Sequence, residues 1–356
     1  MLLDEGREHH QASPRESIGL VESADVIVLG LGPAGAAAAA EAARRGCKVI
    51  ALDRKDEPGR PVQCAELVPA MIEAELAGVT RQRIDAMATF VEDDAPDLKP
   101  DFPGRMLDRA AFDASLVEAA RRAGVDARFS CFVKRVTPEG HVELADRVLE
   151  GRVIVGADGP RSRAGKAVGS VNTDLVETRQ ITLGLKQPYA ATDIFLSAEI
   201  PGGYGWLFPK GDVANLGAGV SPAFKPRLKS IVARLHASQS ERLASEILAL
   251  TGGAIPVGGM LKPFGYLKET LVLLAGDAAG LANPVTGAGI AAAVHSGRLA
   301  GQAAATATPE EYEEELEDLY RPALERARRR RLELMESPMR KSHLRRGWIA
   351  YPEYWQ

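Results

Sequence analysis

The sequence predicts an α/β fold in which a helix-flanked parallel sheet is interrupted by a mainly antiparallel sheet and followed by a helical C-terminus. Three observations predict it. A strand–helix–strand unit occupies Asp25–Leu52. Short apolar runs separated by Gly and Pro, without helices between them, occupy Arg179–Val220. A further apolar strand at Leu271–Leu274 then leads into a second alanine-rich helix. Strands that alternate with helices form parallel sheets, whereas consecutive short strands form antiparallel ones.

The first unit carries three glycines where its first strand ends. Residues 25–35 read DVIVLGLGPAG. In this spacing Gly30 permits a tight turn, Gly32 lets the backbone approach a phosphate, and Gly35 lets the helix pack closely on the strand. The expected helix Pro33–Arg45 directs its unpaired N–H groups toward an anion. The segment therefore predicts a site for a dinucleotide pyrophosphate.

The second strand of this unit, Lys48–Leu52, ends in Asp53, where an acidic residue can bind ribose hydroxyls. Beyond it, the pattern predicts a strand at 86–92, a loop rich in Pro and Asp through 104, a helix at 108–123, and strands at 129–136 and 152–155.

The antiparallel part contains the runs QITLGL, IFLSAEI, YGWLF and VANLGAG. Helices are expected at Pro226–Ala237, at Gln239–Leu250 and from about Thr286, and the charged C-terminus is expected to be helical. We expect these domains: a flexible extension over 1–23, a discontinuous nucleotide-binding domain over 24–85, 105–175 and 268–306, a substrate domain over 86–104 and 176–267, and a charged helical region over 307–356.

Two further glycine–acid clusters identify the dinucleotide. Residues 152–163 read RVIVGADGPRSR, and residues 271–290 read LVLLAGDAAGLANPVTGAGI. An aspartate after a buried strand, such as Asp158 or Asp277, can bind a ribitol hydroxyl while neighbouring N–H groups bind the pyrophosphate. A nicotinamide dinucleotide has no ribitol. Each cluster alone could be a surface turn, but together with the first motif they favour FAD.

These segments resemble a large family of FAD-dependent oxidoreductases that includes aromatic hydroxylases, flavin halogenases and geranylgeranyl reductases. VLGLGPAG, VGADGPRSR and LLAGDAAGLANPVTGAGI match it in type and order, and LDRAAFDASLVEAARRAGV is similar to the helix whose arginine, here Arg109, reaches the cofactor. GRPVQCAELV at 59–68 and GGYGWLFPKGDVANLGAGV at 202–220 are similar to segments of geranylgeranyl reductases. In those enzymes the first segment carries a cysteine beside the flavin, and the second lines the substrate cavity.

The resemblance implies a Rossmann-like FAD-binding domain with an inserted, mainly antiparallel β substrate domain. It also implies reduction of C=C bonds in an isoprenoid chain by hydride from reduced flavin. Cys64 is the expected catalytic residue. The expected cofactor-binding residues are Gly30, Gly32, Ala34, Gly35, Asp53, Arg54, Cys64, Ala65, Arg109, Asp158, Gly276, Asp277, Gly287, Gly289 and Ile290, and the expected substrate-binding residues are Tyr204, Trp206, Phe208 and Pro209.

Several of these residues also have plain structural interpretations. Tyr204, Trp206 and Phe208 alternate along a strand and therefore share one face, where they could either wall an apolar slot or fill the core. A lone cysteine such as Cys64 is often a small buried hydrophobe. Lys210 could project from the end of the aromatic strand or be solvated in a turn. No second GxGxxG motif is found, so NAD(P)H, a ferredoxin-like protein and a quinol all remain open as the reductant.

Composition narrows the class of partner. The chain of 356 residues has a net charge of −4, which does not favour nucleic acid, and its three cysteines predict neither a disulfide scaffold nor a metal site. We expect a cytoplasmic protein. The basic run Arg326–Arg331, with later arginines, lysine and aromatics, predicts either peripheral contact with a membrane or pairing with the preceding acids.

Two other functions share the resemblance or the cofactor. The same fold serves aromatic monooxygenases and halogenases, in which reduced flavin reacts with oxygen. The YGWLFP segment departs from the WxWxIP segment of the halogenases. A flavin-binding electron-transfer subunit would need a surface for a partner, such as an electron-donor protein, instead of a long apolar cavity.

Overall fold

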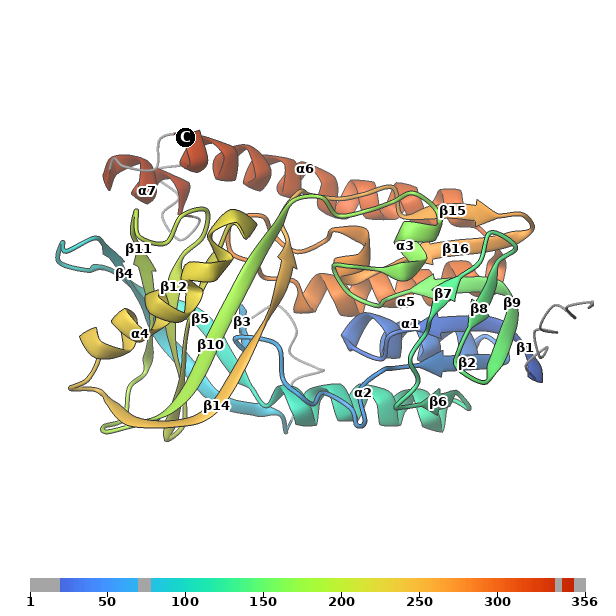
Figure 1. Ribbon diagram of the computed structural model, residues 1–356, viewed down its shortest axis with the longest axis horizontal. Helices are drawn as coiled ribbons and strands as arrows, with labels where there is room; N and C mark the ends of the chain where they lie inside the picture. Colours follow the sequence, from blue (N-terminus) through green and yellow to red (C-terminus); the bar gives the residue numbers. More distant parts are fainter. Residues whose placement is uncertain (1–19, 70–77, 337–340, 349–356) are drawn as a thin grey trace, which may run out of the picture.

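The computed structural model describes residues 20–69, 78–336 and 341–348. It contains two eight-stranded sheets that lie side by side along the long axis of the molecule (Figure 1). The long helix α6 (Pro309–Glu336) runs past both sheets and ends near the short helix α7 (Lys341–Gly347) (Figure 1). The described part of the C-terminal region is therefore mainly helical, as expected, and α6 runs along both halves of the molecule.

The first sheet is the predicted nucleotide-binding sheet. Strand β1 pairs in parallel with β2 on one side and with β9 on the other, and β9 pairs in parallel with β16. Its strands are β1 (Leu20–Leu29), β2 (Val49–Leu52), β6 (Asp126–Arg128), β7 (Arg135–Val136), β8 (His141–Glu143), β9 (Arg147–Gly156), β15 (Phe264–Leu267) and β16 (Thr270–Leu274).

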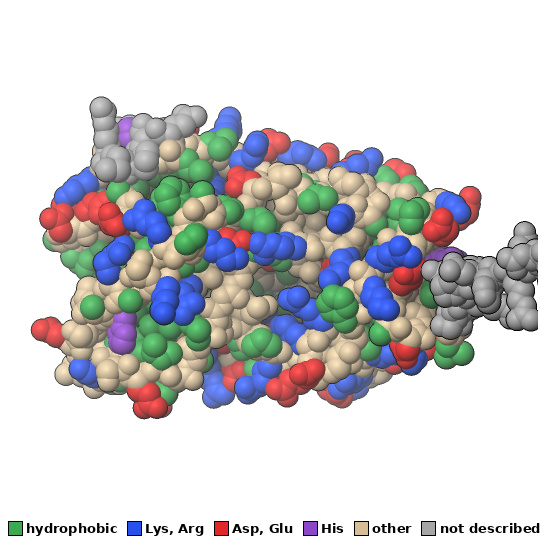
Figure 2. All heavy atoms as spheres, in the orientation of Figure 1, with side chains coloured by type: hydrophobic (Ala, Val, Ile, Leu, Met, Phe, Trp, Pro, Cys, Tyr) green, Lys and Arg blue, Asp and Glu red, His purple; other side chains and the backbone are tan. Residues whose placement is uncertain are grey.

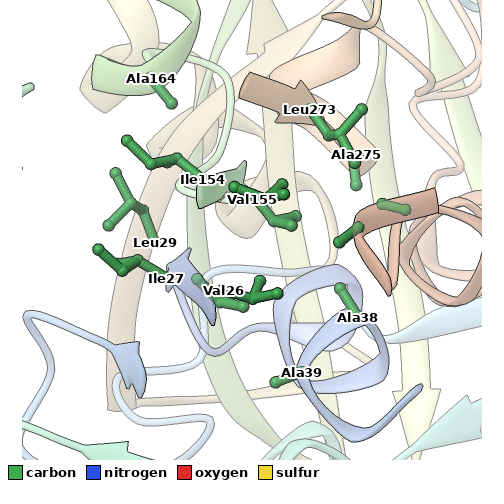
Figure 3. Close-up of a cluster of buried hydrophobic side chains, with 14 of the residues drawn as sticks. Val26, Ile27, Leu29, Ala38, Ala39, Ile154, Val155, Ala164, Leu273 and Ala275 are labelled. Carbon is green, nitrogen blue, oxygen red and sulfur yellow. The ribbon is translucent and has the colours of Figure 1, made fainter. Parts of the chain in front are cut away.

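The core of this half forms because helices cover the parallel strands. Val26–Leu29 of β1 is buried throughout, and its side chains lie among those of β9, β16 and helix α1 (Pro33–Arg44) (Figure 3). Small residues let α1 approach helix α5 (Ile290–Thr306): a Cβ on Gly297 would lie 2.2 Å from the Ala34 carbonyl oxygen. Helix α2 (Arg109–Arg122) begins at Asp108, whose carboxylate accepts a hydrogen bond from the Ala111 amide.

The second sheet is mainly antiparallel, as predicted, with one parallel pair between β11 and β4. In spatial order its strands are β14 (Leu243–Pro256), β10 (Leu175–Leu185), β13 (Val213–Val220), β12 (Gly205–Lys210), β11 (Ala191–Leu196), β4 (Thr80–Val91), β5 (Asp97–Leu107) and β3 (Leu67–Pro69). The 3₁₀ helix η1 (Pro222–Arg227) and helix α4 (Leu228–Ser238) follow β13. The other short helices are α3 (Arg163–Ala167) and η2 (Gly276–Ala279).

Three predicted elements are wrong. The helix expected at 239–250 is instead strand β14, which pairs with β10 along most of its length. The loop expected through 104 contains strand β5. Its Pro100 is tolerated because this part of β5 pairs with β4 on one side only. Of the strand expected at 129–136, only Arg135–Val136 is a strand.

Other boundaries differ by a few residues. Strand β1 begins at Leu20, inside the extension expected over 1–23, and the residues before it lie outside the described part of the chain. Helix α5 begins at Ile290 rather than near Thr286. The domain boundaries expected at 85 and 105 fall inside β4 and β5. No helix in the described residues is both long and apolar enough to cross a bilayer.

Candidate active site

A cavity of about 620 Å³ contains both halves of the predicted site. On one side it is lined by the glycine turn before α1, by Asp277, and by the residues that lead into α5. On the other side it is lined by the aromatic residues of β12 and by residues 251–255 of β14. Cys64, Ala65 and Arg109 also line this cavity. A cavity of this size is typical of ligand sites.

The glycines of the first turn have different tasks. Gly30 has φ +92°, and a Cβ there would lie 2.4 Å from the Ala157 carbonyl oxygen. A Cβ on Gly35 would lie 1.8 Å from the Gly30 carbonyl oxygen. A Cβ on Gly32 would meet no atom within 4 Å, because Gly32 lines the cavity. Gly30 and Gly35 are thus required by the packing of the chain itself, and Gly32 leaves room for a ligand.

Two helices begin at this cavity. Helix α1 follows Gly32 and helix α5 follows Gly289, and neither has a side-chain cap on its first amides. Ala34 and Ile290, in the first turns of these helices, also line the cavity. The partial positive charges of two helix N-termini therefore converge on one enclosed space. This cradle fits the pyrophosphate of FAD.

Asp277 provides the acidic group of the site. Its carboxylate accepts no hydrogen bond from the described residues, although its backbone carbonyl accepts one from Asn172. Burial raises the pKa of the Asp277 carboxyl to about 6, and the charge of Arg109 opposes that rise. A carboxylate held in this way can accept a hydrogen bond from a ligand hydroxyl or N–H group. Asp277 thus fits the ribitol or ring of a flavin.

The loop that carries Cys64 is fastened to the second sheet by side chains from three of its strands. Gln180 of β10 donates to the Cys64 carbonyl oxygen at 3.1 Å, and Asn215 of β13 donates to the Ala65 carbonyl oxygen at 3.3 Å. Lys210 of β12 forms an ion pair with Glu66. These contacts hold three consecutive residues in place beside the cavity.

Glu66 is the centre of this attachment. It is 3 % exposed and has φ +70°. Its carboxylate accepts hydrogen bonds from Asn215 Nδ2 at 2.8 Å and from the Arg109 amide at 3.2 Å, besides its contact with Lys210 Nζ at 2.5 Å. Lys210 is therefore neither free at the strand end nor solvated in a turn, because it joins the two motifs of the resemblance.

Cys64 lies beside a cation. Its Sγ accepts a hydrogen bond from the Glu66 amide at 3.2 Å. Arg109 forms a two-pronged ion pair with Asp113, with distances of 3.0 and 3.1 Å. Burial acts to lower the pKa of the Arg109 guanidinium, but the adjacent Cys64 and Asp113 raise it. Arg109 is thus a fixed positive charge next to the thiol.

The aromatic side chains of β12, together with Tyr204 just before it, lie at the border between the cavity and the core. Tyr204, Trp206 and Phe208 line the cavity and also belong to a buried cluster with Trp348. The Trp206 indole donates to Gln180 Oε1 at 3.0 Å, which links this wall to the Cys64 loop. The Tyr204 hydroxyl donates to the Thr286 carbonyl oxygen, and its ring meets that of Trp348 edge to face. We refer to Tyr204, Trp206, Phe208 and Trp348 as the aromatic wall.

Some predicted residues do not line the cavity. The Asp53 carboxylate accepts hydrogen bonds from the Leu31 and Lys55 amides at 2.8 and 2.9 Å. The Asp158 carboxylate accepts from Ser162 and Arg163 at the start of α3, so its neighbour Gly159 lines the cavity instead. Predicted residues outside the cavity lining are Gly30, Gly35, Asp53, Arg54, Asp158, Gly276 and Pro209.

Other contributors were missed from the sequence. Asn215 was missed although it is a polar residue in the otherwise apolar strand β13, which is a signal of a specific partner. Gln180 gave no such signal, because β10 carries several other polar residues. Glu66 follows Cys64 closely and was not singled out. Trp348 was predicted only as one of the aromatics that follow the basic run, because nothing near it in the sequence connects it with this site. Apolar lining also comes from Met87, Phe102, Ile194 and Ile255.

Comparisons with known proteins agree with this arrangement. The sequence model of the geranylgeranyl reductase catalytic domain matches residues 176–255. Digeranylgeranylglycerophospholipid reductase 2 of Methanopyrus kandleri is 34% identical over 314 residues, which cover 81% of this chain and 78% of the relative. The chain belongs to the geranylgeranyl reductase family. A reductase of this type from Methanosphaera stadtmanae is 32% identical, with 80% of this chain and 78% of the relative covered.

Solved structures show the same fold. A geranylgeranyl bacteriochlorophyll reductase-like protein from Thermoplasma acidophilum has a TM-score of 0.77 at 23% identity, covering 94% of this chain and 98% of that one. A myxobacterial FAD-dependent chondrochloren halogenase has a TM-score of 0.63 at 22% identity, covering 88% and 81%. The prediction of a geranylgeranyl reductase with an FAD-binding α/β fold is confirmed, and FAD is the cofactor that this family implies.

Basic residues near the C-terminus of this geranylgeranyl reductase family member form ion pairs with acidic residues of the second half of the molecule. Lys341 forms ion pairs with Asp93 and Asp94, and Arg345 forms ion pairs with Asp94 and Asp97. Arg331 is buried, and so is Trp348 of the aromatic wall. The later part of the basic and aromatic run also includes Arg340, Tyr351, Tyr354 and Trp355. These four residues lie outside the described part of the chain, so the membrane prediction is not tested there.

Proposed function

We propose that this protein binds FAD between the glycine turn and Asp277 and reduces C=C bonds of an isoprenoid chain held against the aromatic wall. One observation carries the proposal: a single cavity is lined by the uncapped starts of α1 and α5, by the aromatic wall and by Cys64. A flavin site alone would not need an apolar extension of this kind. An electron-transfer subunit would need a partner surface instead.

The residues of the chain have separate tasks in this proposal. When bound and reduced, FAD would supply the hydride that one alkene carbon receives. The aromatic wall orients the flexible chain and excludes water from the reacting bond. Cys64 holds the proton that the second alkene carbon receives. The fixed charge of Arg109 stabilises the thiolate that remains after that transfer. Gln180, Asn215 and Lys210 keep the Cys64 loop in place.

The test is the mass of the product. Dithionite-reduced, FAD-loaded enzyme is incubated without oxygen with a geranylgeranyl lipid, and the lipid is analysed by mass spectrometry. We expect a gain of two hydrogens for each double bond reduced. Cys64→Ser should slow the reduction, whereas Cys131→Ser, at a half-buried cysteine outside the cavity, should not. An unchanged lipid would contradict the proposal, and an oxygenated product in air would indicate a monooxygenase.

Dithionite also replaces the natural electron donor, which the proposal leaves among NAD(P)H, a ferredoxin-like protein and a quinol. Peripheral membrane contact is part of the proposal because the substrate is a lipid. The exposed Arg326, Arg328 and Arg329 support it, since arginines near a surface attract anionic lipid. The face of the molecule in Figure 2 carries positive and negative side chains interspersed, so attraction would be local rather than a property of this whole face.

A further inference from the structure

A second, smaller cavity of about 50 Å³ lies between the C-terminal helices and the second sheet. It shares two lining residues with the main cavity, Tyr204 and Trp348, so these two members of the aromatic wall border both spaces. The remaining lining is mostly apolar and comes from the turn after β11 and from α6 and α7. One water needs roughly 10–15 Å³ of such space, so this cavity holds about three to five water-sized groups, comparable with one phosphate.

Among the described residues that line this cavity, one side chain is charged. Arg331 of α6 is 5 % exposed, and its Nε and Nη2 atoms have no hydrogen-bond partner among the described residues. Burial lowers the pKa of its guanidinium, and the charge of Asp174 opposes that change without forming an ion pair. Other arginines of the same helix are paired, such as Arg321 with Glu317. A buried guanidinium without a partner is costly unless an anion completes it.

We propose that Arg331 binds the phosphate of the lipid substrate while its isoprenoid chain crosses the aromatic wall into the main cavity. This inference rests on the proposed function and deepens it by naming the head group. The planar guanidinium presents its N–H groups in a fork that matches phosphate oxygens. Tyr204 and Trp348 line both cavities, so a chain that reaches from Arg331 into the main cavity would pass along these two aromatic side chains.

The test compares two ligands that differ only in the phosphate, geranylgeranyl monophosphate and geranylgeraniol. Binding to the FAD-loaded enzyme is followed by tryptophan fluorescence, since Trp206 and Trp348 both line the path. Arg331→Met should raise the Kd of the phosphate about 10- to 100-fold, as expected for lost charged hydrogen bonds. It should leave the Kd of the alcohol within about twofold. Arg331→Lys should retain part of the preference.

The control is Lys229→Met, which removes a positive charge from an exposed position of α4 outside both cavities and should change neither Kd. Arg331→Met should also melt no lower than the wild type, because it replaces a buried unpaired cation by an apolar side chain. Inorganic phosphate is the second probe. If it competes with the lipid phosphate in the wild type, the site accepts free phosphate; if it does not, the site recognises phosphate only on the lipid. With either result for inorganic phosphate, the anion site is supported only if Arg331→Met abolishes the preference for geranylgeranyl monophosphate over geranylgeraniol.

The inference is overturned if Arg331→Met weakens both ligands equally, if it weakens neither, or if it lowers the melting temperature while ligand preference is unchanged. Binding does not require turnover, so the two proposals fail separately. Phosphate-dependent binding through Arg331 without any reduction of the lipid would reject the proposed function and keep this inference. Reduction of both lipids by Arg331→Met with unchanged preference would reject only the inference.

Discussion

Replacing Lys210 by methionine would test whether its ion pair with Glu66 fixes the Cys64 loop. The change removes an ammonium that lies 2.5 Å from a carboxylate whose residue is 3 % exposed. Removing one partner of a buried pair costs about 3–5 kcal/mol. The Glu66 carboxylate keeps its hydrogen bonds from Asn215 and the Arg109 amide. We therefore expect Lys210→Met to lower the free energy of unfolding by a smaller amount, about 2–3 kcal/mol.

A double-mutant cycle isolates the pair. Glu66→Gln should cost about 1–2 kcal/mol, because the Lys210 side chain is 22% exposed and can turn toward water. The double variant leaves no unpaired charge, so its loss should be smaller than the sum of the single losses by about 1–2 kcal/mol. The assay is urea unfolding of each variant followed by tryptophan fluorescence, to which Trp206, hydrogen-bonded to Gln180 of the same attachment, contributes.

A control variant and the size of the coupling decide the outcome of the urea-unfolding assay. Lys229→Met, at an exposed lysine of α4, should change the unfolding free energy by less than about 0.5 kcal/mol. If the losses from Lys210→Met and Glu66→Gln add within about 0.5 kcal/mol, the two side chains are not coupled. The attachment of the Cys64 loop through this pair would then be rejected.

Three further predictions concern the two sides of the cavity. Gly32→Ala should leave the stability of the FAD-free protein unchanged but weaken FAD binding at least about tenfold, whereas Gly35→Ala should destabilise the fold because its Cβ would lie 1.8 Å from a carbonyl oxygen. Fluorescence titration measures the FAD affinity and thermal melting measures the stability. An FAD affinity of Gly32→Ala equal to that of the wild type would contradict our account. Because the pKa of Asp277 is raised to about 6 in the fold, the native state holds its proton more tightly than the unfolded chain, so stability is lost as pH rises from about 4 to 6. Asp277→Asn should not show this loss, and its FAD-free form should gain about 2–3 kcal/mol over the wild type between these pH values in urea unfolding; parallel pH profiles would refute the assignment. Trp206→Ala should retain FAD but raise the KM for a long-chain lipid, whereas Trp206→Phe should preserve most of the wall; loss of FAD from the alanine variant, measured by absorbance of the purified protein, would show that Trp206 supports the cofactor instead.

The sequence could predict the nucleotide-binding half because its signals are local. Gly30, Gly32 and Gly35 encode their turn within six positions, and the strand before them is buried as its apolar run predicts. Strand β14 was predicted as a helix because its first half is rich in Ala, Leu and Glu, which favour helices. Pairing with β10 along the sheet edge overrides that weak preference, and such long-range pairing leaves no local pattern.

The site divides in the same way. Asp277 and Gly289 could be found because they lie within motifs whose shape a dinucleotide requires. Gln180 and Asn215 act only where the neighbouring strands β10 and β13 bring them to the Cys64 loop, so their role depends on the register of the second sheet. Arg331 lies in a basic run that resembles a solvated helix face, and only the packing of α6 shows that it is buried.

The central claim is that one cavity brings reduced FAD and an isoprenoid chain together. The most direct measurement is anaerobic stopped-flow mixing of the reduced, FAD-loaded enzyme with a geranylgeranyl lipid. Our account predicts that the absorbance of oxidised FAD returns in a phase whose rate depends on lipid concentration, and that the fully saturated lipid produces no such phase. Reoxidation at the same rate with unsaturated lipid, saturated lipid and buffer would contradict it.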